Sequence, residues 1–326
     1  MKTLAYYWLS LASVASATID GTVTNKTTGK PQPMVTITLY KLGATGLEFI
    51  ASVKSDAAGK FRIDQNLQGT RLLMSAYGGV TYNHMLPPNA PTTDVALDVF
   101  NSSRKPGGAK VMEHLVLFEP TAIELAISER YIWRNTGKTT FSDPDRGTLQ
   151  FHVPPESKGI QVNCTAPQGQ PIRRAPQPAG APDVYKIDFP IKPGQSQIVV
   201  NYTLPFTSPG TFEGRIFYKG NPTSLIAPQG VQLKGDGLIF RGQDPQFGTS
   251  IYQTAAAAYK VEIVLQRPQA AEMDQSDPQI QFVLPKLYNK LAWVLALSLS
   301  ILALGFALLY RSDQPVVSAR KFGKRK

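Results

Sequence analysis

Hydrophobic and polar residues alternate in short runs over residues 18–100, and turn residues separate one run from the next. In the run at 34–42, the apolar residues Val35, Ile37 and Leu39 alternate with polar ones, which is the period of a strand with one buried face. The region holds seven such runs and no helical period, so we predict an antiparallel β-sandwich. The runs lie at 18–25, 34–42, 47–55, 60–64, 70–79, 80–86 and 94–100.

Residues 109–266 are predicted to be β-rich as well, and to form a second, larger sandwich. Its runs lie at 111–119, 122–135, 147–154, 184–191, 196–206, 211–218, 230–235, 237–242 and 259–266. The run at 122–135 has a predicted buried face of Ile123, Leu125, Ile127, Tyr131 and Trp133, opposite Glu124, Ser128, Arg130 and Arg134. Residues 101–108 are polar and glycine-containing, which predicts a flexible linker. Residues 165–183 are rich in Pro, Ala and Gln, which predicts a surface insertion without strands.

The two ends of the chain carry apolar segments of a different kind. Lys2 precedes a short apolar run and the small residues 15–17, so we predict that residues 1–17 are a signal peptide. A first strand of the domain is the alternative. Residues 291–310 are twenty residues without a charge, about 30 Å long as a helix. They predict a transmembrane helix, with a buried core helix as the alternative.

The charge behind this span sets the expected orientation. Residues 311–326 carry six basic residues and one acidic residue, net +5, and the positive-inside rule places such a tail in the cytoplasm. We therefore expect an all-β, single-pass protein of the cell membrane. Its N-terminal body would be periplasmic or extracellular, and the proline-containing residues 267–290 would form a stalk.

The composition of the chain limits which partners and which disulfide chemistry can be expected. The net charge is +11, of which the tail supplies +5 and Lys2 supplies +1, leaving +5 for residues 18–310. This mild surplus does not indicate a nucleic-acid partner. Cys164 is the only cysteine, so no internal disulfide can form, and we expect a buried apolar thiol.

Two motifs in the first region resemble a known family. The first is Ile19-Asp20-Gly21-Thr22-Val23-Thr24, followed by Thr28-Gly29-Lys30-Pro31 and the strand at 35–37. The second is Ser55-Asp56-Ala57-Ala58-Gly59-Lys60-Phe61, where Gly59 would take positive φ, Asp56 would bind backbone amides and Phe61 would enter the core. Both are similar to the carboxypeptidase regulatory-like family, over about eighty residues.

This resemblance implies a transthyretin-like Greek-key sandwich, usually an accessory module, and it does not imply peptidase activity. The zinc-peptidase pattern His-x-x-Glu is missing, because His84, His114 and His152 are followed at the third position by Pro, Leu and Pro. Residues 109–266 resemble regions that follow such a module in some bacterial envelope proteins.

A search for reactive groups predicts no catalytic, cofactor-binding or metal-binding residues. Residues 137–140 mimic the end of a phosphate loop and residues 143–147 resemble a calcium loop, but a turn is favoured at both. The three histidines are spread over both regions, so a shared metal site is not expected. The carboxylates of Glu113, Glu119, Glu124 and Glu129 are expected to be solvated on strand faces.

Three functions from different classes fit these observations. The favoured one is a non-catalytic envelope protein, not an enzyme, whose sandwiches bind a protein or a glycan or serve envelope assembly. The second is an accessory subunit of a membrane complex, with the span at 291–310 packed against other helices. The third is a hydrolase, for which a pocket of ionisable side chains within 109–266 would be the structural sign.

Overall fold

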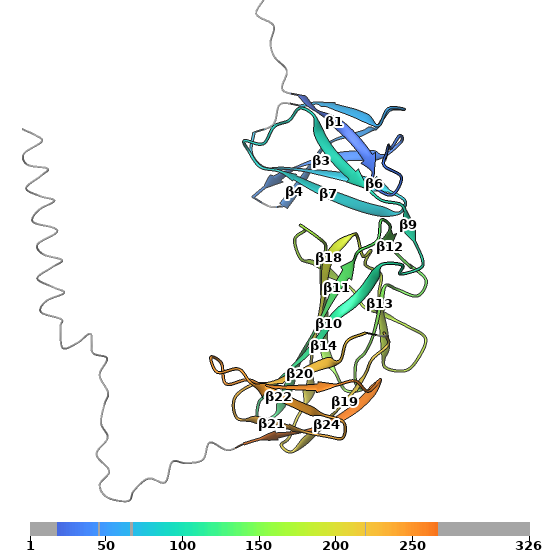
Figure 1. The fold of residues 1–326 in the computed structure, drawn as a ribbon. Helices are drawn as coiled ribbons and strands as arrows, with labels where there is room; N and C mark the ends of the chain where they lie inside the picture. Colours follow the sequence, from blue (N-terminus) through green and yellow to red (C-terminus); the bar gives the residue numbers. More distant parts are fainter. Residues whose placement is uncertain (1–17, 45, 66–67, 219, 267–326) are drawn as a thin grey trace, which may run out of the picture. The chain divides into compact units, whose positions relative to one another are not determined.

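The computed structural model describes residues 18–266, apart from 45, 66–67 and 219 (Figure 1). These residues contain 24 strands in several sheets and no helix, which confirms the all-β class. No helix that could cross a membrane occurs within this part of the chain. The predicted signal peptide, stalk, transmembrane helix and tail, at 1–17 and 267–326, lie outside it.

The seven strands predicted in the first region are all present. They are β1 (Thr18–Asn25), β3 (Thr36–Gly43), β4 (Gly46–Lys54), β5 (Lys60–Asp64), β6 (Arg71–Tyr77), β7 (Val80–Leu86) and β8 (Val95–Val99). A short additional strand, β2 (Lys30–Pro31), pairs with the end of β1. The four strands β4-β3-β6-β7 form one sheet, and β1 forms the other with β2, β5 and β8. A common apolar core joins the two sheets, and Val35, Ile37 and Leu39 are fully buried in it.

The turn between β4 and β5 has the predicted chemistry. Asp56 Oδ1 accepts hydrogen bonds from the amides of Ala58 and Lys60, at 2.9 and 2.8 Å. Gly59 has a φ of 73°, a conformation that costs a residue with a Cβ. Phe61 follows on the inner face, 4% exposed. The turn therefore returns the chain to the core two residues after the glycine.

Residues 101–108 make more contacts than a flexible linker would. They contain β9 (Ser102–Ser103), which pairs in parallel with β12 (Thr140–Phe141). Asn101 accepts a hydrogen bond from Asn25 Nδ2 at 2.8 Å, and its amide donates to Thr27 Oγ1 at 2.9 Å. The first region is thus hydrogen-bonded to the start of the second.

The second region holds the remaining strands. The longest are β10 (Ala109–Pro120), β11 (Glu124–Asn135) and β18 (Gly194–Pro205). The others are β13 (Leu149–His152), β14 (Lys158–Thr165), β15 (Ile172–Arg174), β16 (Gln177–Pro178), β17 (Val184–Ile187), β19 (Gly210–Arg215), β20 (Thr223–Ala227), β21 (Val231–Lys234), β22 (Ile239–Gln243), β23 (Ser250–Thr254) and β24 (Ala258–Leu265).

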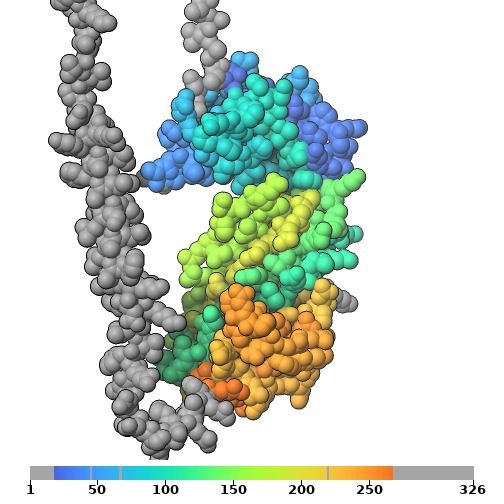
Figure 2. Space-filling model, turned by 60° about the vertical axis from the view of Figure 1, so that its left-hand side comes forward, coloured from blue at the N-terminus to red at the C-terminus, as the bar shows by residue number. Residues whose placement is uncertain are grey.

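Eight of these strands form one sheet in the order β15-β14-β18-β11-β10-β20-β23-β22. Two three-stranded sheets, β13-β17-β16 and β19-β24-β21, share an apolar core with it. Its edge strand β22 carries the exposed apolar residues Ile239 and Phe240. In Figure 2 the surface of the second region runs from green through yellow to orange. The sheet has many strands, and these strands come from most of the second region.

Several expectations for the second region need correction. The strands β14, β20 and β23 were not predicted, because their short runs mix apolar and polar residues without a clear period. Residues 165–183 contain β15 and β16, whose residues are exposed; neighbouring strands supply the pairing that their composition does not favour. Ile123 is 80% exposed, because it precedes β11 and does not follow that strand's alternation.

Candidate functional site

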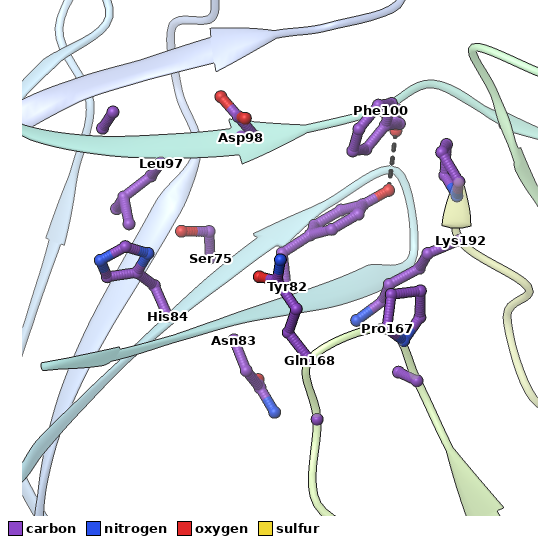
Figure 3. Close-up of a pocket in the computed structure, with 14 residues that line it drawn as sticks. Ser75, Tyr82, Asn83, His84, Leu97, Asp98, Phe100, Pro167, Gln168 and Lys192 are labelled. Atoms are coloured by element: carbon purple, nitrogen blue, oxygen red, sulfur yellow. Dashed lines mark hydrogen bonds between the residues drawn. The ribbon is translucent and has the colours of Figure 1, made fainter. Parts of the chain in front are cut away.

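A cavity of about 270 Å³ lies beside β7 and β8, which are edge strands of the two sheets of the first sandwich. The loops at 166–169 and 192–193 of the second region line its other side. We call this cavity the cleft. The side chains that matter below are Ser75, Tyr82, His84, Asp98, Gln168 and Lys192 (Figure 3).

The hairpin of β6 and β7 sets the inner wall of the cleft. Gly78 and Gly79 have φ of 57° and 77°, the signs that a two-residue hairpin turn requires. This turn places Ser75 opposite Tyr82 across the two strands. Because side chains alternate along a strand, Tyr82 and His84 lie on the same face of β7.

Tyr82 ties the two regions together at one end of the cleft. Its hydroxyl donates to the carbonyl of Phe100 at 3.0 Å and lies 2.9 Å from Thr140 Oγ1. Lys192 Nζ lies 4.9 Å from the centre of the Tyr82 ring and donates to the carbonyl of Thr81. Tyr82 of the first region and Lys192 of the second region therefore lie side by side in the cleft, as Figure 3 shows.

Burial changes the pKa of Lys192 and the pKa of Tyr82. It lowers the pKa of the Lys192 ammonium to about 8, because a partly desolvated charge is disfavoured. Burial raises the pKa of the Tyr82 hydroxyl, and its hydrogen bonds to Thr140 and Phe100 oppose the rise. Near neutral pH the cleft therefore presents a neutral phenol beside an ammonium that is close to losing its proton.

Other polar side chains also line the cleft. Ser75 is 1% exposed, and its Oγ has no hydrogen-bond partner among the described residues. A buried hydroxyl without a partner is costly, so a ligand that bonds to it would gain free energy. Asp98 lies 3.4 Å from Lys26, and its side chain is 46% exposed. The cleft combines hydroxyl, imidazole, amide, carboxylate and ammonium groups within one small volume.

A second polar cluster lies inside the core of the second region. Glu129 Oε2 accepts from Tyr131 at 2.5 Å, and its Oε1 accepts from Tyr202 at 2.6 Å. His114 Nε2 lies 3.2 Å from Glu129 Oε2, and His114 Nδ1 lies 3.1 Å from Thr223 Oγ1. Burial by itself would raise the pKa of Glu129, but the hydrogen bond and charge of His114 and the two tyrosine hydroxyls outweigh it and lower the pKa.

The bonded order of Thr223, His114 and Glu129 is that of a hydroxyl–imidazole–carboxylate triad. Thr223 has no exposed surface and His114 is 2% exposed, and the Thr223 hydroxyl already has a partner in His114 Nδ1. The cluster gives hydrogen-bond partners to Glu129, His114, Tyr131, Tyr202 and Thr223, which is a structural role.

A bulge brings His114 into this cluster. The register of β10 with β11 shifts between Val111 and Glu113, so Met112 is an extra residue. Val111 points inward before the bulge, and His114 points inward after it. Glu129 shares the inner face of β11 with Ile127 and Tyr131. This alternation is visible in the sequence, and it would have predicted that the side chain of Glu129 is buried.

The structure separates the remaining residues that the sequence singled out. Glu113, Glu119 and Glu124 are exposed as expected, whereas Glu129 is 5% exposed, so the expectation that all four are solvated is wrong for Glu129. The histidines lie in three places: His84 in the cleft, His114 in the core, and His152 in another pocket. Within the described residues, no group of three or more His, Cys, Asp or Glu could hold a metal ion.

Cys164 and the turn at 143–147 behave as predicted, whereas residues 137–140 do not form the predicted hairpin turn, because β11 and β12 belong to different sheets. Cys164 is fully buried in the apolar core, and burial raises the pKa of its thiol to about 12. Residues 137–139 form a bend between β11 and β12. Asp143 Oδ1 accepts from the amides of Asp145 and Arg146, at 3.2 and 3.1 Å, which closes a turn.

No protein-family model and no curated protein matches the chain. Among solved structures, a match is found to a point mutant of a two-domain M1 zinc metallopeptidase bound to L-tryptophan. The identity is 13%, the TM-score is 0.29, and the match covers 48% of this chain and 43% of that chain. The chain therefore spans less than half the length of that protein.

The matched structure is that of an enzyme, and we withdraw the prediction that the protein is not an enzyme. A likeness at this TM-score carries no argument for peptidase chemistry in this chain. The pocket that the hydrolase hypothesis calls for is nevertheless present between residues 109 and 266, where His152, Asp183, Glu213, Arg215 and Lys260 line a common cavity.

Proposed function

We propose that this protein displays its β-sandwiches outside the cytoplasm and binds a polar ligand of the glycan class in the cleft. The cleft supports this proposal through Ser75, whose buried Oγ has no partner among the described residues. A sugar hydroxyl donates and accepts at once, as the serine hydroxyl does, so the two match as partners. The volume of about 270 Å³ suits a ligand of one or two sugar units.

The other side chains of the cleft fit the same ligand class. Gln168 offers two donors and one acceptor on a planar amide. Asp98 and His84 add an acceptor and an imidazole, and the rings of Tyr82 and Phe100 supply apolar surface. Mixed polarity with a flat apolar wall suits a sugar ring, which has polar edges and apolar faces.

The first region belongs, in this proposal, to the carboxypeptidase regulatory-like family. Its two four-stranded sheets and the Asp56–Gly59 turn agree with the transthyretin-like Greek-key sandwich that the family implies. In that family the module is an accessory to another domain. The contacts of β9 with β12 and of Tyr82 with Thr140 suit a module that builds a binding cleft with its neighbour.

Anchoring by residues 291–310 completes the proposal. The uncharged span and the net +5 tail behind it support one crossing with the body outside. Protease added to intact spheroplasts should remove the body and leave the tail protected. A body that resists protease until the membrane is opened would overturn this orientation. The alternative of an accessory subunit depends on the same span, which lies outside the described residues.

Calorimetric titration of the full chain tests ligand binding, in a detergent without a sugar headgroup. The probes are glucose, galactose, N-acetylglucosamine, glucuronic acid and their common disaccharides. Ser75→Ala should weaken binding about tenfold, the cost of one lost hydrogen bond. Ser196→Ala is the matched control, because Ser196 is also 1% exposed with an unpartnered Oγ but does not line the cleft. Absence of binding to every probe, or equal effects of both substitutions, would refute the proposal.

A further inference from the structure

A second pocket, of about 390 Å³, lies between two open sheet edges of the second region. On one side, β13 pairs only with β17 among the described strands; on the other, β19 pairs only with β24. Each edge leaves backbone N–H and C=O groups without a strand partner. Such edges can hold the backbone of a short extended ligand.

Charges of both signs surround this pocket. Glu213 and Arg215 alternate with buried residues on β19, so both point to its outer face. Glu213 is paired with Lys260 at 3.0 Å. Arg215, Asp183 and Glu156 line the pocket and make no ion pair among the described residues. One cation and two carboxylates therefore remain available to a ligand.

His152 supplies an independent sign that the pocket takes a ligand. It is 5% exposed, lines the pocket, and its Nδ1 has no hydrogen-bond partner among the described residues. Burial, and next the charge of Arg215, lower the pKa of His152. The imidazole is thus neutral at neutral pH, and its unpartnered nitrogen calls for a polar neighbour.

Apolar side chains line the rest of the wall. Phe206 and Phe212 are buried, and Leu204 and the prolines at 154 and 155 lie beside the cavity. A ligand that fills this pocket therefore needs an apolar body as well as two opposite charges. A free amino acid supplies that chemistry in part, and a dipeptide fits the volume of the pocket better.

We propose that this pocket binds a zwitterionic ligand of dipeptide size. The ligand's carboxylate pairs with Arg215, which can bind it through two parallel hydrogen bonds. Its ammonium pairs with Asp183, and Glu156 adds a second negative charge. Its backbone lies along the open edge of β19, most of whose residues line the pocket, and there the peptide N–H and C=O groups find partners.

Calorimetric titration with leucyl-leucine tests this site in the full chain. The N-acetyl and C-amide forms of the dipeptide remove one charge each, and each should bind at least about tenfold more weakly. Arg215→Gln should weaken binding of leucyl-leucine but not of its C-amide. Asp183→Asn should weaken leucyl-leucine but not the N-acetyl form; asparagine tolerates the φ of 60° found at this position.

Arg134→Gln is the matched control, since Arg134 is exposed and does not line this pocket. It should leave all three affinities unchanged. Ser75→Ala should also leave them unchanged, which separates this site from the cleft. The proposal fails if leucyl-leucine does not bind, if both capped forms bind as tightly as the free dipeptide, or if Arg134→Gln acts like Arg215→Gln.

Discussion

Replacement of Glu129 by Gln tests how the core of the second region is held. The substitution keeps the size of the side chain and removes its charge. In the wild type the carboxylate accepts from Tyr131, Tyr202 and His114. Hydrogen bonds to a charged group stabilise by about 1.5–3 kcal/mol each, against about 1 kcal/mol for neutral ones.

We expect Glu129→Gln to lower the free energy of unfolding by about 3 kcal/mol. Tyr131 and Tyr202 donate to different oxygens of the carboxylate, and glutamine has only one acceptor oxygen. One tyrosine bond therefore weakens by about 1 kcal/mol, the other hydroxyl faces the amide NH2 group, and the charge pairing with His114 is lost as well. Breaking a buried pair by removing one partner costs about 3–5 kcal/mol, and the remaining amide oxygen keeps the loss at the lower end of that range.

Urea denaturation followed by tryptophan fluorescence measures this loss. Trp133 lies on the same strand as Glu129 and is 6% exposed. Trp8→Phe and Trp293→Phe would leave Trp133 as the only tryptophan. A loss of 3 kcal/mol should move the midpoint by about 1 M urea for a chain of this size.

The pH dependence has a definite sign. The pKa of Glu129 is lower in the folded chain than in the unfolded chain, so its carboxylate stabilises the fold above the unfolded pKa of about 4.3. That stability is lost as the pH falls through the folded pKa. The difference between wild type and Glu129→Gln should therefore shrink from pH 7 to pH 3.

A triple variant separates the lost charge from the orphaned hydroxyls. Glu129→Leu alone leaves two buried hydroxyls without a partner, whereas adding Tyr131→Phe and Tyr202→Phe removes those hydroxyls. The triple variant should regain about 2 kcal/mol or more relative to Glu129→Leu. Equal stability of the wild type and Glu129→Gln at pH 7, or no recovery in the triple variant, would refute the reasoning.

Three further predictions concern other parts of the chain. Gly59→Ala should cost at least about 1 kcal/mol more than Gly29→Ala in urea denaturation, because both glycines have positive φ but only at Gly59 would a Cβ meet a backbone oxygen, at 2.7 Å; equal costs would contradict this. The folded pKa of Lys192 is about 8 and the unfolded value is about 10.4, so the unfolded chain binds more protons in that window and stability should rise with pH there. Lys192→Met should remove this rise, and a rise that persists would assign it to another group. Cys164, with its pKa raised to about 12 by burial, should react with iodoacetamide at pH 8 only after unfolding in urea, and modification of the native chain at the rate of a free thiol would disprove it.

Local pattern was enough to predict the strands of the first sandwich, but not that β8 pairs with β1 in parallel, where an antiparallel sandwich was predicted. The bounds of β1 and β5 agree with the predicted runs at 18–25 and 60–64. The turn at Asp56–Gly59 and the burial of Cys164 were also predicted. These features depend on side-chain alternation and on backbone preferences of a few neighbouring residues, so the sequence carries them directly.

The cleft and the cluster around Glu129 could be found only in the tertiary structure. Ser75 and Lys192 face one cleft because β9 pairs with β12 and joins the two regions. No local sequence pattern predicts that pairing. The bulge at Met112 turns His114 toward Glu129, and alternation alone cannot locate an extra residue in a strand. Sequence by itself determined where the regularly alternating strands and their turns form. Sheet pairing between distant residues decided where the short, irregular strands form and which polar groups meet, because those contacts are made only once the sheet edges are in place.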